Sequence, residues 1–157
     1  MYRKDKNEKD VLYILENLKP EDKKEAITIK GENYKEIILK EIMSNSSITY
    51  LGCQKDDTPI CVGGYTDTET SGIGVVWLLS TLEVEKNKIA LFRNILDAMK
   101  EIDEKYYFTY NFLYKENYFA KKWLKKIGYK FNNPKPAGLN IPNDFEFFYR
   151  VRKTRGL

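Results

Sequence analysis

The sequence predicts one α+β domain of three layers, in which helices cover both faces of a mixed, twisted sheet. Segments with an apolar residue every three or four positions alternate with segments that repeat every two, so helices and strands alternate along the chain. The segment Gly72–Thr81 is almost continuously apolar, which predicts a central strand covered on both sides. With 157 residues, the chain is long enough for one hydrophobic core.

The first third of the sequence predicts a strand followed by two helices. Residues 1–10 are almost wholly polar and are expected to form a flexible N-terminal arm. Val11–Leu15 is apolar without a gap, which predicts a buried first strand. Pro20, followed by two acids, predicts the start of a helix that ends before Gly31. A second apolar stripe predicts a helix from about Asn33 to Met43.

The middle of the chain predicts a hairpin, the central strand and the longest helix. Ser47–Gln54 and Ile60–Tyr65 flank an Asp-Asp turn and are expected to pair as a hairpin. The central strand Gly72–Thr81 follows, and the linker Leu82–Lys88 then leads into the longest helix. In that helix apolar residues recur at helical spacing from Ile89 to Ile102.

The last third predicts an aromatic strand, a capped helix and two further strands. Tyr106–Tyr114 places aromatic residues on one face of a strand. The next helix begins after Asn117, whose side chain is suited to cap it, and ends at Gly128. Its apolar stripe consists of Ala120, Trp123, Leu124 and Ile127. Strands over Tyr129–Asn132 and Phe145–Val151 follow, separated by a loop that includes residues 133–138.

The expected order is therefore β-α-α-β-β-β-α-β-α-β-β, in a single domain over residues 11–151. A basic tail over residues 152–157 follows this domain. Trp77 and Trp123 lie on the apolar faces of their elements and are expected to be largely buried.

Charge and hydropathy exclude some classes of partner. The net charge of +4 comes from 27 basic and 23 acidic residues that are interspersed, so nucleic acid is not an expected partner. The clearest basic cluster is Arg150, Arg152, Lys153 and Arg155, interpreted as a solvated tail. No apolar run approaches the ~18 residues of a membrane span, and the N-terminus has no signal-peptide pattern, which predicts a cytosolic protein without a membrane partner.

The chain has no histidine and two cysteines, which removes the usual zinc sites and the Ser-His and Cys-His nucleophile pairs. Catalysis, if present, depends on a carboxylate, a tyrosine, a backbone amide or water. Cys53 and Cys61 flank the hairpin turn, so a disulfide between them is geometrically possible. Two buried thiols are the favoured interpretation in a reducing compartment.

Three motifs carry a resemblance to a known family. They are Leu18-Lys19-Pro20-Glu21-Asp22, Val76-Trp77-Leu78-Leu79-Ser80-Thr81, and Asn117 followed by Trp123-Leu124-Lys125-Lys126-Ile127-Gly128-Tyr129. In this order the chain resembles the GNAT (N-acetyltransferase) fold, and within it a phage family described as internal virion protein A-like or as a domain of unknown function. The resemblance implies a virion component with an acetyltransferase-like fold. Fold alone does not establish activity.

The resemblance also implies a phosphate cradle before the long helix, of the form Arg/Gln-x-x-Gly-x-Gly/Ala, whose glycines let backbone amides reach a diphosphate. Here the linker Leu82–Lys88 has no glycine. Its acids Glu83 and Glu85 would repel phosphates, while Lys86 and Lys88 offset them only through side chains. This favours a protein that binds no cofactor, with acetyl-CoA as the alternative.

The catalytic groups that the resemblance implies are also missing or displaced. A tyrosine seven residues after the asparagine commonly serves as general acid in the family, but that position holds Leu124. Asp67 and Glu69 are candidate bases, although solvated turn residues are the favoured interpretation. Amides around Leu79 and Thr81 would polarise a thioester carbonyl if the central strand is splayed.

The sequence therefore favours a non-catalytic GNAT-like protein that acts in phage assembly or in the virion. Its expected partners are other virion or assembly proteins, with possible self-association, in the host cytoplasm and then in the particle. The alternative is an acetyl-CoA-dependent N-acetyltransferase that acts on a protein or small-molecule amine. No catalytic residue is assigned and no metal is expected. The cofactor-binding candidates in the active case are Leu79, Thr81, Lys86, Lys88 and Asn117.

Overall fold

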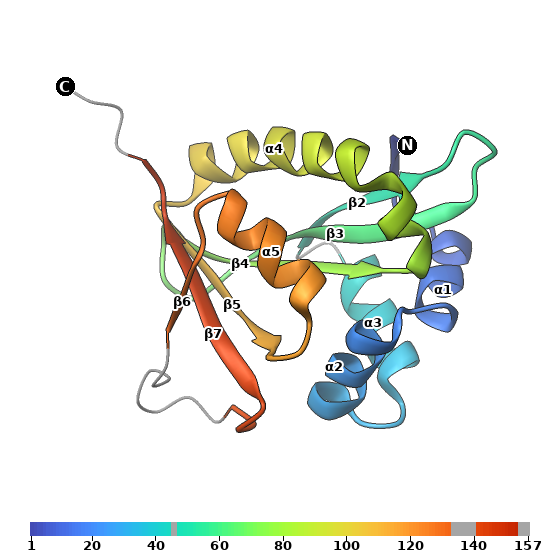
Figure 1. Ribbon diagram of the computed structural model, residues 1–157, viewed down its shortest axis with the longest axis horizontal. Helices are drawn as coiled ribbons and strands as arrows, with labels where there is room; N and C mark the ends of the chain where they lie inside the picture. The colour runs from blue at the N-terminus through green and yellow to red at the C-terminus, as the bar shows by residue number, and fades with distance from the viewer. Residues whose placement is uncertain (45–46, 133–140, 154–157) are drawn as a thin grey trace.

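A computed structural model describes residues 1–44, 47–132 and 141–153, and it confirms the predicted three-layer class (Figure 1). The strands form one sheet in the order β1-β2-β3-β4-β5-β7-β6. Neighbouring strands are antiparallel except for β4 and β5, which pair in parallel. The strands are β1 Tyr2–Asp5, β2 Ser47–Cys53, β3 Pro59–Asp67, β4 Ile73–Ser80, β5 Phe108–Tyr114, β6 Lys130–Asn132 and β7 Phe145–Val151.

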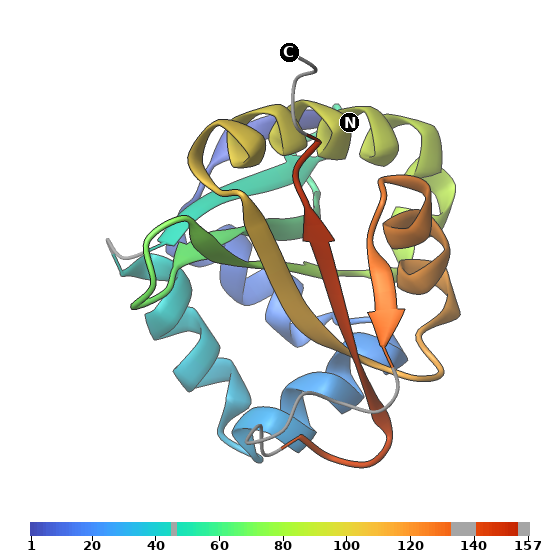
Figure 2. The same cartoon turned by 90° about the vertical axis from the view of Figure 1, so that its left-hand side faces the viewer.

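Helices cover both faces of the sheet, as Figures 1 and 2 show. The helices are α1 Glu8–Glu16, α2 Pro20–Lys30, α3 Tyr34–Met43, α4 Lys88–Lys105 and α5 Tyr118–Lys126, and a 3-10 turn, η1 Leu82–Asn87, precedes α4. One core lies between α1–α3 and the β2–β4 half of the sheet, and a second lies beneath α4 and α5. A third, smaller cluster joins η1 and α4 to β3.

The prediction of a first strand over Val11–Leu15 is wrong, because this segment belongs to helix α1. Its fully buried side chains are Val11, Ile14 and Leu15, a helical spacing, while Tyr13 is 42% exposed. A short apolar run does not separate a strand from a helix, and here capping decides, because the Asn7 side chain accepts a hydrogen bond from the Asp10 N–H. The element order therefore has three helices before the hairpin.

The residues predicted to form a loose arm supply the first strand instead. Tyr2–Asp5 pairs antiparallel with β2 at the edge of the sheet. Lys4 forms an ion pair with Asp10, and Lys6 donates hydrogen bonds to the carbonyl groups of Ile42 and Ser44. Long polar side chains thus attach this segment to the domain, a role that polarity alone does not reveal.

The tail cluster is also partly incorporated in the fold. Arg150 lies in β7, forms a bidentate pair with Asp103 of α4 and donates to the Ile127 carbonyl. Arg152 donates to the Asp103 carbonyl. Arg150 is therefore part of the fold, whereas Arg152 follows β7 and is exposed. Arg155 and the predicted loop over residues 133–138 lie outside the described residues.

Other local predictions are confirmed. Helix α2 begins at Pro20 and ends at Gly31, whose φ of 82° favours glycine. Asn117 caps α5 by accepting a hydrogen bond from the Ala120 N–H, and Gly128 follows with a φ of 97°. Both cysteines are free, buried thiols.

The two tryptophans are less buried than predicted, since each is only half-buried at the margin of a core. Trp77 borders the cavity described below. No helix among the described residues is long and apolar enough to cross a membrane.

Candidate functional site

Strands β4 and β5 diverge after a short parallel ladder. Ile73–Val75 of β4 pairs with Phe108–Tyr110 of β5, and the ladder between the two strands ends there. The Asn111 side chain ends the ladder, because its amide nitrogen donates to the Val76 carbonyl over 2.7 Å. Its amide oxygen accepts from the Phe112 N–H over 2.8 Å. The Asn111 carboxamide thus occupies the Val76 carbonyl and the Phe112 N–H, the two groups that would form the next hydrogen bond between the strands, and the strands separate here.

The divergence leaves part of the β4 edge without a partner strand. Successive residues of β4 direct their N–H and C=O groups alternately toward β3 and toward the gap between β4 and β5, so the register decides which groups face this gap. The Thr81 N–H donates to Ile60 next to β3, so Leu79 also directs its N–H and C=O toward β3. Leu78, one residue earlier, directs its N–H and C=O into the gap, where β5 no longer pairs with it. The amides of Leu79 and Thr81, predicted to face a thioester, thus point the other way.

A cavity of about 870 Å³ opens at the divergence. Its lining comes from α2–α5 and from strands β1–β5 and β7, and includes Trp77, Leu78, Phe112, Asn117 and Ala120. Most of the lining side chains are apolar, while a small set of buried polar groups lies at one end. This combination is typical of small-molecule sites in proteins.

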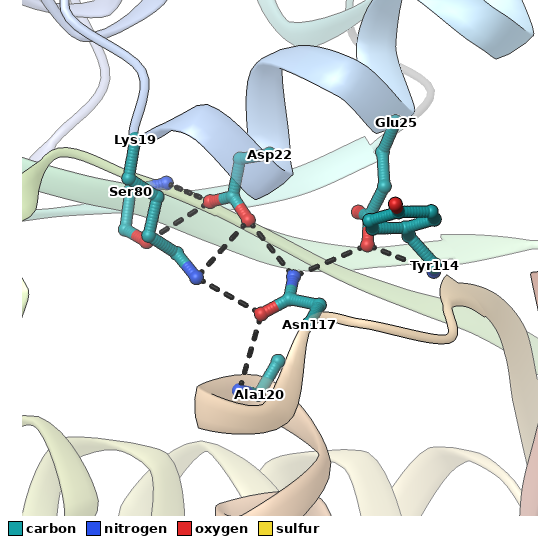
Figure 3. A network of polar contacts seen from close by, with 7 residues as sticks. All are labelled: Lys19, Asp22, Glu25, Ser80, Tyr114, Asn117 and Ala120. Atoms are coloured by element: carbon teal, nitrogen blue, oxygen red, sulfur yellow. Dashed lines mark hydrogen bonds and ion pairs between the residues drawn. The ribbon is translucent and has the colours of Figure 1, made fainter.

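The polar end of the cavity is a network that joins α2 to β4 (Figure 3). Lys19 donates its backbone N–H to the Ser80 carbonyl, and Asp22 accepts from the Ser80 N–H over 2.8 Å and from its hydroxyl over 3.0 Å. The Lys19 ammonium lies 3.4 Å from the Asp22 carboxylate, and both side chains are almost fully buried. The segment before α2 therefore covers the end of the β4 edge, and Leu78 remains open.

Asn117 links this network to helix α5. It caps the helix with its amide oxygen, which also accepts from the Lys19 ammonium over 3.0 Å. Its amide nitrogen donates to Asp22 and to Glu25, each over 3.1 Å. The residue is 1% exposed, so it holds α2, β4 and α5 in a fixed relation around the cavity.

Glu25 is a carboxylate with an unusual environment. One oxygen accepts from the Tyr114 N–H over 2.9 Å and from Asn117, and the residue lines the cavity. Burial, reinforced by the nearby Asp22 carboxylate, raises the pKa of Glu25 to about 7. Burial also raises the pKa of Asp22, an effect that Lys19 and the Ser80 donors partly offset. At neutral pH Glu25 is thus able to accept or release a proton.

The end of the gap toward α4 differs from a phosphate cradle. The η1 turn follows β4 directly, with the Val84 N–H bonded to the Thr81 carbonyl and the Glu83 N–H to the Thr81 hydroxyl. Lys86 is 3.5 Å from Glu83 and exposed. Lys88 lies 5.9 Å from the centre of the Phe119 ring. Positive charge at this end therefore comes from the Lys86 and Lys88 side chains and not from backbone amides, as the sequence suggests.

The other candidates fall outside the site. Leu124 is buried and has no proton to donate. Asp67 accepts from the Tyr106 hydroxyl over 2.5 Å and pairs with Lys105. Neither Asp67 nor Glu69 lines the large cavity. The part of the chain described here contains no group of three or more residues suited to a metal ion.

Of the predicted cofactor-binding residues, Asn117 and Leu79 line the cavity, whereas Thr81, Lys86 and Lys88 do not. Sequence reasoning missed Lys19, Asp22, Glu25, Leu78 and Asn111. One signal was present: Asp22 and Glu25 are three residues apart on a helix, and therefore on one face.

The fold of this chain is similar to those of solved acetyltransferase structures. An aminoglycoside 6'-acetyltransferase type Ii matches with a TM-score of 0.72 at 15% identity, covering 99% of this chain and all of that one. A GCN5-related N-acetyltransferase from Kribbella flavida has a TM-score of 0.69 at 15% identity, covering 96% and 97%. The PaiA N-acetyltransferase of Thermoplasma acidophilum, solved with coenzyme A, has a TM-score of 0.68 at 15% identity, covering 96% and 98%.

No family model matches the sequence, and the search of curated proteins gives no match. At this identity the structural likeness shows the fold, which is GNAT-like. Nothing in the comparisons points to a phage or virion family, so they do not support the resemblance to a phage protein family that the sequence motifs suggest.

Proposed function

We propose that this chain is an N-acetyltransferase that transfers an acetyl group from acetyl-CoA to an amine. The observation that carries the proposal is the open Leu78 edge in a cavity of about 870 Å³. An unpaired N–H and C=O on a strand edge suit an extended chain that contains amides, by the same hydrogen bonds that add a strand to a sheet. The pantetheine arm of coenzyme A is such a chain. Structural neighbours that are N-acetyltransferases support this choice.

The residues of this chain fit one part of the coenzyme better than another. The Leu78 edge fits the pantetheine arm, and Asn117 holds the segments around it in place. At the other end Lys86 and Lys88 supply charge without a glycine cradle, so we expect weak contacts with the phosphates. Bound there, the coenzyme supplies the activated acetyl group.

Three groups of the chain then have defined roles. Glu25 takes a proton from the acceptor ammonium, because its raised pKa makes it a base of suitable strength near neutral pH. The Leu78 C=O would accept from an amide of the pantetheine arm, which leaves the Leu78 N–H to stabilise the negative charge that develops on the carbonyl oxygen. The Lys19 ammonium, held by Asn117 and paired with Asp22, fixes the segment that covers the end of the open edge.

A non-catalytic role in phage assembly is the second candidate, with other virion proteins as partners. The observation that favours it is the linker Leu82–Lys88, which forms η1 in place of a glycine-rich loop. In this case the cavity is a vestige of the fold, and the Lys19–Asp22 cover over Ser80 is permanent.

Calorimetric titration with acetyl-CoA separates the two candidates. The enzyme requires binding tighter than about 100 µM, or about 5.5 kcal/mol. The absence of heat at millimolar acetyl-CoA would favour the assembly role. Transfer is then followed as thiol release with a panel of amines. Glu25→Gln, which keeps the shape and the hydrogen-bond acceptor, should bind acetyl-CoA normally and lose about 100-fold or more in kcat.

A further inference from the structure

We propose that the acceptor is a monoamine attached to an apolar or aromatic group, and that polyamines and amino sugars are poor acceptors. This inference rests on the proposed function and narrows its substrate class. Two structural neighbours are named for polycationic compounds, an aminoglycoside and spermidine. The cavity of this chain offers one lining carboxylate, Glu25, that forms no ion pair among the described residues.

The charged side chains that line the cavity do not suit a polycation. They comprise four cations and three carboxylates: Arg3, Lys19, Lys30, Lys40, Asp22, Glu25 and Glu41. Asp22 is paired with Lys19, and Glu41 is paired with Lys30 over 2.7 Å. Glu25 forms no ion pair among the described residues. Arg3 is paired with Glu101 over 3.1 Å. One lining carboxylate is therefore available, which suits one ammonium group, whereas further cationic groups would meet carboxylates that are already paired, or apolar walls.

An aromatic wall lies next to that carboxylate. The Tyr114 N–H binds Glu25, and Phe112 lies two residues earlier in β5 with its side chain on the same face as that of Tyr114. Two residues along a strand span about 7 Å. This distance suits an amine nitrogen and a ring joined by a short carbon chain.

Phe112 is held in place by other rings. Its centre lies 5.4 Å from that of Phe147 and 6.3 Å from that of Tyr110. Phe112 and Trp77 both line the cavity, whereas Tyr110, Phe147 and Tyr149 continue the aromatic row outside it. Phe112 thus presents a fixed apolar surface to whatever binds beside Glu25, and a ring or apolar chain gains contacts that water does not supply.

The test compares acceptors at saturating acetyl-CoA. We expect kcat/KM for 2-phenylethylamine to exceed that for spermidine and for kanamycin by about 100-fold or more, since one poorly matched group in a pocket already costs 10- to 200-fold. Binding of each amine without acetyl-CoA, measured by calorimetry, should give the same order. Faster transfer to spermidine or kanamycin than to 2-phenylethylamine would overturn the inference and leave the proposed function standing.

A variant and a matched control locate the effect. Phe112→Ala should raise KM for 2-phenylethylamine about tenfold or more, with little change in KM for n-propylamine, which is too short to reach the ring. Phe112→Leu, which preserves the core better, should show a smaller rise. Tyr149→Ala removes a ring from the same aromatic row outside the cavity and should leave both KM values unchanged. Equal rises for both amines would overturn the inference. No acetyl-CoA binding and no transfer to any amine would instead refute the proposed function.

Discussion

Two stretches that follow one another in the sequence, the open edge of β4 and the linker after it, differ in which features of the chain specify them. The open edge at Leu78 consists of backbone groups, and any sequence that keeps β4 and β5 apart preserves it. The linker Leu82–Lys88 depends on side chains, because only glycines allow a loop there to bring its amides close to a phosphate. The open edge is present in this chain, whereas the linker lacks the glycines of a phosphate cradle.

This difference teaches that a fold preserves some parts of a site more readily than others. At the strand divergence one side chain, Asn111, takes the place of the next backbone hydrogen bond between the strands. A phosphate cradle needs several specific residues in order. The presence of the first is therefore weak evidence for the second, and the two stretches should respond differently to substitution.

The largest expected effect is at the polar end of the open edge. Asp22→Ala leaves Lys19 without its buried counter-charge and the Ser80 N–H without an acceptor, so we expect a loss of roughly 3–5 kcal/mol in the free energy of unfolding. Glu85→Ala, at the exposed linker, should change it by less than about 0.5 kcal/mol. Denaturant unfolding measures both, and equal losses would remove the contrast between the two stretches.

The second effect depends on pH. Because the pKa of Glu25 is higher in the folded protein than in the unfolded chain, the unfolded chain loses this proton first as the pH rises. Stability is therefore greatest below the unfolded pKa and falls as the pH rises toward about 7. At about 1.4 kcal/mol per pKa unit, the loss reaches up to about 3 kcal/mol.

Glu25→Gln removes this titration and is the matched control. The difference in unfolding free energy between wild type and Glu25→Gln should change between pH 5 and pH 8, in the direction that wild type weakens. A difference that stays constant over this range would show that Glu25 ionises as freely in the folded protein as in water.

The third effect is on the apolar wall. Trp77→Ala should cost about 2 kcal/mol, less than the 3–5 kcal/mol typical of a fully buried aromatic residue, because Trp77 is half-buried. Thermal unfolding provides the measurement, and Tyr118→Ala, at a residue that is 70% exposed, is the control. A shift in Tm as small as that of the control would mean that Trp77 does not pack against the α1–α3 core.

The smallest effect is at the linker. If Lys88 contacts a phosphate, Lys88→Ala should weaken acetyl-CoA binding by about 2- to 5-fold, as expected for an exposed ion pair worth up to ~1 kcal/mol. Lys100→Ala, near the other end of α4, should have no effect. A loss of 100-fold or more would show that side chains have replaced the cradle, and that the two stretches are equally adapted to the coenzyme.

Most of the fold is predictable from the sequence because periodicity and capping report local structure. Pro20, Gly31, Asn117 and Gly128 mark helix ends correctly. The failure at Val11–Leu15 arose because a run of five apolar residues suits both a strand and a helix, and the deciding contact is the Asn7 cap.

The site is less predictable because it depends on contacts between distant segments. Asp22 and Ser80 are 58 residues apart, and Asn111 and Val76 are 35 apart. The sequence points to Leu79 and Thr81, which lie one and three residues after Leu78 and direct their amides to the opposite side, because the direction of an amide follows from strand register and not from residue type.

The Asn111 carboxamide has a consequence for how such a pocket could change over time. The Asn111 side chain takes the place of one hydrogen bond between the strands. Asn111→Val would therefore leave the Val76 carbonyl and the Phe112 N–H free to bond to each other, and the β4–β5 ladder would lengthen by one hydrogen bond. A single substitution at this position would therefore move the point at which the two strands part, and with it the start of the cavity.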